Sequence, residues 1–204
     1  MAVCKTFPAE AILEAYAAGQ RLFGENRVQE FVEKFPNVAG LADARFHMIG
    51  HLQSNKTAKA AEIFHAVDSI DSAKLAQRLN DSAQKLGKTL DVLIEINVGG
   101  EEAKSGLAPD SPEIETIFSQ TAQWKNLRVS GLMTVPPYTE DPEGARSYFR
   151  KLRELRDRLA AREFPGVSLD VLSMGMSNDF EVAIEEGSTC VRIGTAIFGE
   201  RHYL

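Results

Sequence analysis

Apolar, strand-like runs alternate with helical segments eight times along this sequence, and this alternation restricts the fold more than any other feature. The apolar runs begin near residues 2, 21, 46, 66, 91, 128, 169 and 191. Such alternation is typical of a parallel sheet with helical crossovers. Eight units in one chain predict an α/β fold of the closed (β/α)8 TIM barrel type. No G-x-G-x-x-G run follows the first strand to support a dinucleotide fold.

The composition excludes several classes of protein. Hydrophobic residues make up 44% and charged residues 25% of the 204-residue chain, and we expect a single domain over residues 1–204. The net charge of −6 argues against a nucleic-acid surface, which needs a basic footprint. We expect no membrane span, because no run reaches roughly 18 apolar residues. Cys4 and Cys190 give no disulfide framework, which favours a reducing cytoplasm.

Near the end of the chain, two strand-like runs each break into a loop of small residues before a helix. The first loop is residues 173–177, Ser-Met-Gly-Met-Ser, and the second is Gly194-Thr195. Loops of this kind present backbone N–H groups at a helix N-terminus, where the helix dipole favours an anion. The loops after strands seven and eight of a (β/α)8 barrel often bind phosphate. We interpret the pair as a phosphate grip; the alternative is that these residues are ordinary turn formers.

A lysine at a strand end supplies a reactive amine beside the predicted phosphate site. Lys5 follows the first strand, and the carboxyl ends of all strands meet at one rim of a barrel. A lysine amine attacks a carbonyl only when neutral, and desolvation lowers its pKa. Pyridoxal 5′-phosphate (PLP) supplies both an aldehyde and a phosphate, so this pattern indicates a PLP site. Further polar or functional residues at strand ends are Asn26, His47, His51, Asp68, Ser69, Asn97, Met133, Thr134, Ser173 and Arg192.

Two other candidates have competing interpretations. His47 and His51 are four residues apart, like two zinc ligands on a helix, but they fall on a strand and its loop. Structural hydrogen bonding is therefore the better interpretation. Lys104, in the long loop after the fifth strand, is either a solvated loop lysine or a residue near the pocket mouth.

Several longer stretches carry a family resemblance. They are residues 2–6 (AVCKT), 23–26 (FGEN) with 28–30 (VQE), 47–56 (HMIGHLQSNK), 67–69 (VDS), Asn97 with 104–106 (KSG), 131–133 (GLM), 172–177 (LSMGMS) with Asp179, and 191–195 (VRIGT) with 198–199 (FG). Together they resemble the pyridoxal phosphate homeostasis protein family, also called the proline synthase co-transcribed protein family. Its fold is similar to the N-terminal barrel domain of alanine racemase.

This resemblance implies a role for each matching residue. Lys5 would carry PLP as an internal aldimine, and Arg192 would face the pyridine nitrogen. Asn26 and Met133 would line the ring pocket. The phosphate would be held by Ser177, Gly194 and Thr195.

The sequence departs from the family pattern at its start. Family members usually begin with a helix before the first strand, whereas Val3 is already strand-like here, so we expect a barrel lacking that helix. The family also usually has serine where this chain has Cys4. Because neighbouring side chains of a strand point to opposite faces, we expect Cys4 to pack away from Lys5.

Two functions fit such a site: a binding protein that stores, buffers or delivers PLP in the cell, and a PLP-dependent amino-acid racemase. Racemisation needs two opposed acid–base groups, and Tyr138 is the only tyrosine expected near the barrel mouth. Arg192 stays protonated and would leave the ring nitrogen unprotonated, which makes PLP a poorer electron sink. We therefore expect a non-catalytic, monomeric, cytoplasmic PLP-binding protein. Its expected partners are PLP and apo forms of PLP-dependent enzymes, with neither nucleic acid nor membrane.

Overall fold

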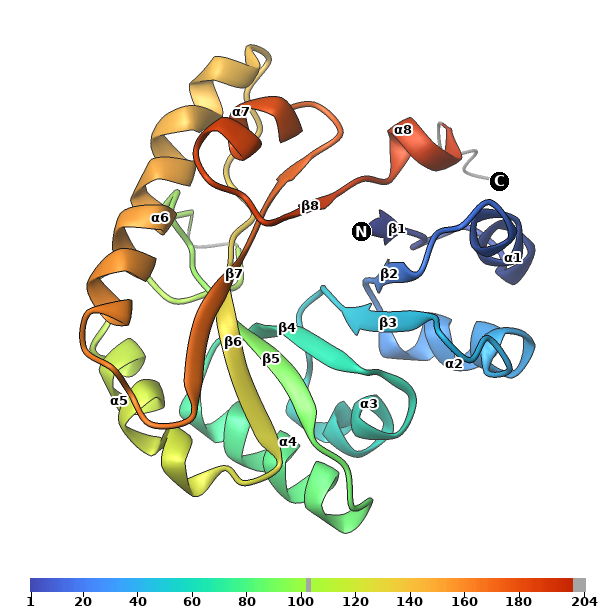
Figure 1. Cartoon of the computed structure of the whole chain (residues 1–204), viewed down its shortest axis with the longest axis horizontal. Coiled ribbons are helices and arrows are strands. Elements are labelled where there is room, and N and C mark those ends of the chain that lie inside the picture. Colours follow the sequence, from blue (N-terminus) through green and yellow to red (C-terminus); the bar gives the residue numbers. More distant parts are fainter. Residues whose placement is uncertain (102–103, 200–204) are drawn as a thin grey trace.

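The computed structural model describes residues 1–101 and 104–199, and its strands form one eight-stranded parallel sheet in the order β1 to β8 (Figure 1). The strands are β1 Ala2–Val3, β2 Leu22–Glu25, β3 Arg45–Met48, β4 Ala66–Ile70, β5 Leu90–Glu95, β6 Leu127–Met133, β7 Val167–Met176 and β8 Cys190–Arg192. Each begins within two residues of its predicted position. The predicted (β/α)8 architecture is confirmed.

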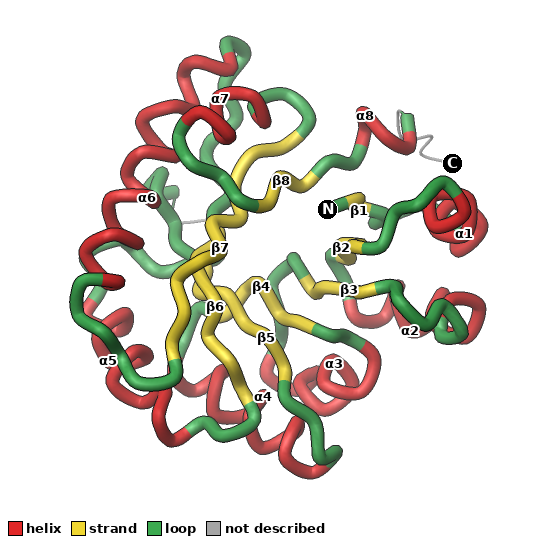
Figure 2. The backbone as a smooth tube through the Cα atoms, in the orientation of Figure 1, coloured by secondary structure: helices red, strands yellow, loops and turns green. Residues whose placement is uncertain are grey.

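Helices follow the strands and form an outer layer around them (Figure 2). The α-helices are α1 Ala9–Ala17, α2 Val28–Val38, α3 Thr57–Ile63, α4 Ala73–Lys85, α5 Pro112–Gln120, α6 Arg146–Ala160, α7 Phe180–Glu185 and α8 Thr195–Phe198. The 3-10 helices are η1 Ser54–Lys56, η2 Thr121–Gln123 and η3 Pro142–Ala145. Within the described part of the chain, no helix is long and apolar enough to cross a membrane.

The first and last strands meet and close the barrel. Ala2 bridges to Ile193 in parallel register, the Val3 N–H donates to the Ile193 carbonyl at 2.7 Å, and the Ile193 N–H donates to the Met1 carbonyl at 2.9 Å. Closure satisfies backbone groups that an open sheet edge would leave unpaired. It also makes Lys5, just beyond β1, a neighbour of the loop that follows β8.

An aromatic cluster fixes helix α2 against the first half of the barrel. Phe31 of α2 stacks on Phe64 and packs against Phe46, with ring centroids 4.8 and 4.9 Å apart, and Phe46 stacks on Phe23. All four rings are buried. Burial of each contributes about 1.5–3 kcal/mol. The cluster therefore gives α2 a rigid position beside the ends of β1 and β2.

Candidate cofactor site at the carboxyl rim

The seven residues predicted for the site come from five strand ends that are neighbours around the barrel, in the order β6, β7, β8, β1 and β2. They are Met133 at the end of β6, Ser177 after β7, Arg192 at the end of β8 with Gly194 and Thr195 after it, Lys5 after β1, and Asn26 after β2. The topology thus gathers residues from positions 5 to 195 on one arc of the carboxyl rim. Whether all seven contact a ligand stays a prediction.

The two loops of the predicted phosphate grip touch each other. The Ala196 N–H, in the first turn of α8, donates to the Ser177 hydroxyl at 3.4 Å. Gly175 has a φ of +94°, and a Cβ on it would come within 2.5 Å of the Ala183 Cβ, so only glycine fits this bend. The bend turns the chain from β7 toward α7 and leaves Ser177 beside the start of α8. Gly194 lies against β1, since a Cβ there would come within 3.5 Å of the Val3 carbonyl.

Arg192 is buried, with 4% of its surface exposed, and is held by backbone at two strand ends. Its Nη1 donates to the Ser173 carbonyl at 2.7 Å and to the Ser173 hydroxyl at 2.8 Å, and its Nη2 donates to the Thr134 carbonyl at 2.7 Å. Burial lowers the pKa of Arg192 from its usual value, while nearby acidic groups such as Asp68 and Glu95 oppose that shift. The three bonds fix the guanidinium and use only part of its donor capacity.

Cys4 and Lys5 face different surroundings, as predicted. The Cys4 side chain is fully buried on the helix side of the strand, where its Sγ lies 3.2 Å from the Glu25 Oε1. Burial, together with Glu25, raises the pKa of the Cys4 thiol far above its usual range. Cys4 is therefore a packed, protonated thiol. The side chain of Lys5 is half-buried at the rim.

Glu95 at the end of β5 is a rim residue that the sequence analysis missed. It is 7% exposed, and its Oε2 is buried without a hydrogen-bond partner among the described residues. Burial and the nearby Asp71 raise its pKa to about 7, against the opposing effect of Arg192. A charged residue after the apolar run 92–94, two positions before Asn97, was the available signal. The rim thus holds a buried carboxyl group that interacts electrostatically with Arg192.

Each of the two predicted histidines lies beside an aspartate, which agrees with the structural interpretation. The His47 Nδ1 lies 3.1 Å from the Asp68 Oδ1, and the His51 Nδ1 lies 3.3 Å from the Asp71 Oδ2. No group of three or more metal-ligating side chains occurs within residues 1–101 and 104–199. The Lys104 Nζ pairs with Glu101 and donates to the Pro136 carbonyl at 3.2 Å, which ties the loop after β5 to the loop after β6. Whether Lys104 acts near the pocket mouth stays a prediction.

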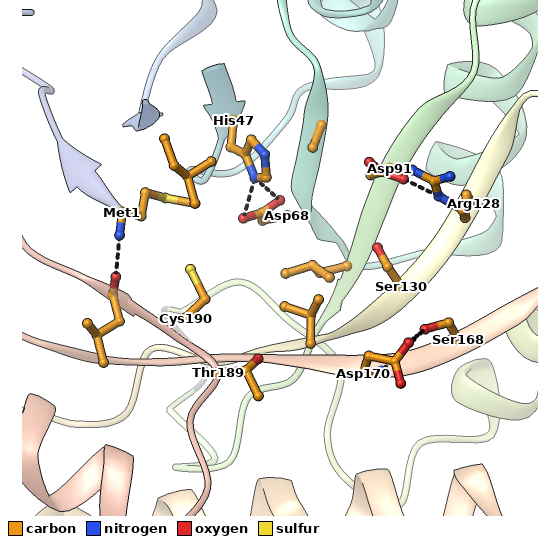
Figure 3. A pocket seen from close by; sticks show the side chains of 15 residues that line it. Met1, His47, Asp68, Asp91, Arg128, Ser130, Ser168, Asp170, Thr189 and Cys190 are labelled. Atoms are coloured by element: carbon orange, nitrogen blue, oxygen red, sulfur yellow. Dashed lines mark hydrogen bonds and ion pairs between the residues drawn. The ribbon is translucent and has the colours of Figure 1, made fainter. Parts of the chain in front are cut away.

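A sizeable cavity lies at the opposite end of the barrel (Figure 3). It measures about 840 Å³ and is lined mainly by residues from the amino ends of the strands, among them Leu22, Ala66, Asp91 and Arg128. The His47–Asp68 pair and Cys190 point into it. None of the seven predicted site residues lines this cavity. The cavity of about 840 Å³ and the predicted PLP site therefore lie at different ends of the barrel.

Comparison with known proteins identifies the family. Residues 1–202 match the family described as alanine racemase, N-terminal domain. The chain is 51% identical over 199 residues to the pyridoxal phosphate homeostasis protein of Aquifex aeolicus, covering 98% of this chain and 85% of that protein. It is 43% identical over 211 residues to the mouse protein of the same name, covering 100% of this chain and 77% of that protein.

Solved structures agree with this relationship. The structure of PipY from Synechococcus elongatus with PLP bound has a TM-score of 0.88 and 38% identity, and the match covers 98% of this chain and 91% of that one. An alanine racemase from Clostridium difficile has a TM-score of 0.77 at 17% identity over 99% of this chain and 55% of its own, a likeness of fold alone. From the barrel, the strand-end residues and these matches, the chain belongs to the pyridoxal phosphate homeostasis protein family, within the alanine racemase N-terminal domain family.

Proposed function

We propose that this protein binds PLP at the carboxyl rim of its barrel and stores, buffers or delivers it, without a fixed catalytic reaction. The observation that carries the proposal is the arc of five neighbouring strand ends, with Lys5 beside two loops joined by the Ser177–Ala196 hydrogen bond. An amine and an anion-binding pair of loops on one rim match the two functional groups of PLP. The relatives named above, and PipY with PLP bound, support the same cofactor.

In this proposal each predicted residue has a role in binding PLP. Ser177, Gly194 and Thr195 hold the phosphate through a hydroxyl and backbone N–H groups at the start of α8. Lys5 supplies the amine for the aldehyde, which is the chemistry that PLP brings when bound. Arg192, fixed by Ser173 and Thr134, presents its remaining donors toward the ring nitrogen. Met133 and Asn26 line the ring from either side of the arc.

The environment of the rim favours holding the cofactor over turning over an amino acid. Arginine keeps its proton, so Arg192 does not protonate the ring nitrogen. Among the tyrosines that the structure describes, Tyr138 is 79% exposed, Tyr16 bonds to Asp43, and Tyr148 of α6 packs against the hydrophobic core. Tyr203 lies outside the described residues. No described tyrosine is thus fixed over the rim as a second acid–base group.

Transfer and racemisation assays separate the two functions. Loaded protein is mixed with an apo form of a PLP-dependent enzyme, and recovery of that enzyme's activity is followed. In parallel, loaded protein is incubated with L-alanine in D₂O, and chirality and Cα deuterium are measured separately. We expect transfer, and racemisation slower by a factor of about 10² to 10⁴ than a two-base enzyme achieves. Formation of D-alanine at roughly one turnover per second or faster would overturn the proposal and direct attention to Tyr138.

The same proposal includes the oligomeric state, the compartment and the partners of the protein. We infer a monomer in the cytoplasm, with PLP and apo-enzymes as partners. Both described cysteines are free thiols, which agrees with a reducing compartment. Light scattering of the purified protein tests the oligomeric state, with a mass near 22.4 kDa expected.

A further inference from the structure

We propose that Glu30 and Lys34 of helix α2 are positioning residues that clamp the turn carrying Lys5. The clamp acts on the backbone of this turn from helix α2, which lies outside the barrel. The contacts between α2 and the turn are the evidence that the clamp exists. Its effect on the attachment of PLP to Lys5 rests on the proposed function.

The turn that carries Lys5 holds an unfavourable backbone conformation. The Phe7 N–H donates to the Cys4 carbonyl at 3.2 Å, so Lys5 and Thr6 are the two central residues of a tight turn. Thr6 has a φ of +67°, a left-handed conformation that a β-branched residue rarely adopts. At this position of such a turn, glycine or asparagine is the usual residue. Strain of this kind persists only where surrounding contacts impose it.

Helix α2 supplies those contacts on both sides of Lys5. The Lys34 Nζ donates to the Cys4 carbonyl at 3.0 Å, and the Thr6 N–H donates to the Glu30 Oε1 at 2.5 Å. Lys34 and Glu30 also bond to each other, with the Nζ 2.7 Å from the same Oε1. The backbone groups before and after Lys5 are therefore tied to one ion pair.

A third group, the carboxyl of Glu25, joins the ion pair, and burial raises its pKa above the usual value. Glu25, fully buried at the end of β2, accepts from the Lys34 Nζ at 2.9 Å. Burial alone would favour a neutral amine, but Glu25 and Glu30 raise the pKa of Lys34 above its ordinary value. Burial likewise opposes ionisation of Glu30, yet its bonds from Lys34 and Thr6 lower its pKa. Both clamp residues are charged at neutral pH, which gives their hydrogen bonds roughly twice the strength of neutral ones.

Fixing the backbone on both sides of a residue fixes the direction of its Cα–Cβ bond. Because the aromatic cluster holds α2 rigidly, the clamp sets the root of the Lys5 side chain relative to the rim. A reactive group held by rigid elements loses less freedom when its partner arrives. We therefore assign to Glu30 and Lys34 a share in the rate at which Lys5 captures an aldehyde.

The test uses one substitution at two positions of α2. Glu30→Ala removes the acceptor for the Thr6 N–H, and Glu33→Ala changes an exposed residue of the same helix as the matched control. Glu30→Gln restores an acceptor oxygen without the charge. The first readout needs no cofactor: amide hydrogen exchange at Thr6 should accelerate about 10- to 100-fold in Glu30→Ala, as expected for loss of a bond to a charged group. Exchange should change less than twofold in Glu33→Ala and partly recover in Glu30→Gln.

The second readout is the rate at which PLP becomes trapped on Lys5 by borohydride, measured beside the affinity for pyridoxine 5′-phosphate. That compound keeps the phosphate but has an alcohol in place of the aldehyde. We expect trapping in Glu30→Ala to slow about tenfold while this affinity stays within twofold. Lys34→Met should act in the same direction.

Equal exchange at Thr6 in Glu30→Ala and Glu33→Ala would overturn the clamp. Trapping as fast as in the unaltered protein, despite faster exchange, would overturn its role in positioning Lys5. Failure of the unaltered protein to attach PLP at Lys5 would instead refute the proposed function, and the exchange experiment would still decide whether the clamp exists.

Discussion

The two ends of this barrel differ in how they treat polar groups. At the carboxyl rim, Arg192 is buried and satisfied by three hydrogen bonds to neighbouring strand ends. At the amino end, a cavity of about 840 Å³ is lined by both apolar and polar residues, and its charged side chains pair with one another, as His47 does with Asp68 and Arg128 does with Asp91. Burying an unpaired cation is costly, so Arg192 needs its bonds more than a pair that water reaches, such as Arg128 and Asp91, needs its own. We propose that the buried and fully held cation marks the end where a specific ligand is recognised.

This contrast warns against equating a cavity of this size with the functional site. In (β/α)8 enzymes the carboxyl rim carries the chemistry and the opposite face contributes to stability. We propose the same division here, with the cavity of about 840 Å³ on the stability side. Variants placed at the two ends test the comparison directly.

The largest effect is expected from Lys5→Ala. Without the amine, the absorbance band at about 420 nm that PLP gives on a lysine should be lost completely. The matched control is Lys104→Ala, a lysine from another loop of the same rim, which should keep the band. A full band in Lys5→Ala would remove Lys5 from the site.

The phosphate should contribute most of the non-covalent affinity. Several charge-assisted hydrogen bonds at about 1.5–3 kcal/mol each predict that pyridoxal, which lacks the phosphate, binds at least about 100-fold more weakly than PLP. Competition binding with both compounds measures the ratio. Similar affinities would mean that the loops at Ser177 and Thr195 are ordinary turns.

Glu95 should give the stability of the protein a pH dependence that originates at the rim. Its pKa is raised from 4.5 to about 7, so the folded state retains a proton that the unfolded state releases between these values. Stability should therefore fall as pH rises through this window, by up to about 3 kcal/mol at 1.36 kcal/mol per pKa unit. Urea unfolding at pH 4.5 and 7.5 should show a smaller fall in Glu95→Gln. Equal falls in both proteins would show that Glu95 titrates like an exposed carboxyl.

The smallest effects compare one hydroxyl at each end. Ser177→Ala removes a predicted phosphate ligand and should weaken PLP binding about tenfold. Ser130→Ala removes a hydroxyl that lines the amino-end cavity and should change affinity less than twofold. Equal losses in a titration of the two variants would contradict the assignment of PLP to the rim.

Much of this molecule could be predicted from its sequence, because the barrel depends on local patterns. Strand starts followed from apolar runs such as residues 91–98, and the orientation of Cys4 followed from strand alternation. Glu95 was missed since it stands between apolar neighbours in a run that already begins with the carboxylate of Asp91. The clamp was missed for another reason: Glu30 and Lys34 form an i,i+4 pair, which is typical of an exposed helix face. Only tertiary contacts with residues 24 and 30 positions away make that pair a partly buried one.

The most direct test of the account is the location of the attached cofactor. Protein incubated with PLP is reduced with borohydride, digested and analysed by mass spectrometry, with the unloaded protein as reference. The account predicts one pyridoxyl group per chain, on the peptide that contains Lys5. Attachment to another lysine, or scattered attachment to several, would contradict the claim that PLP is held at the carboxyl rim.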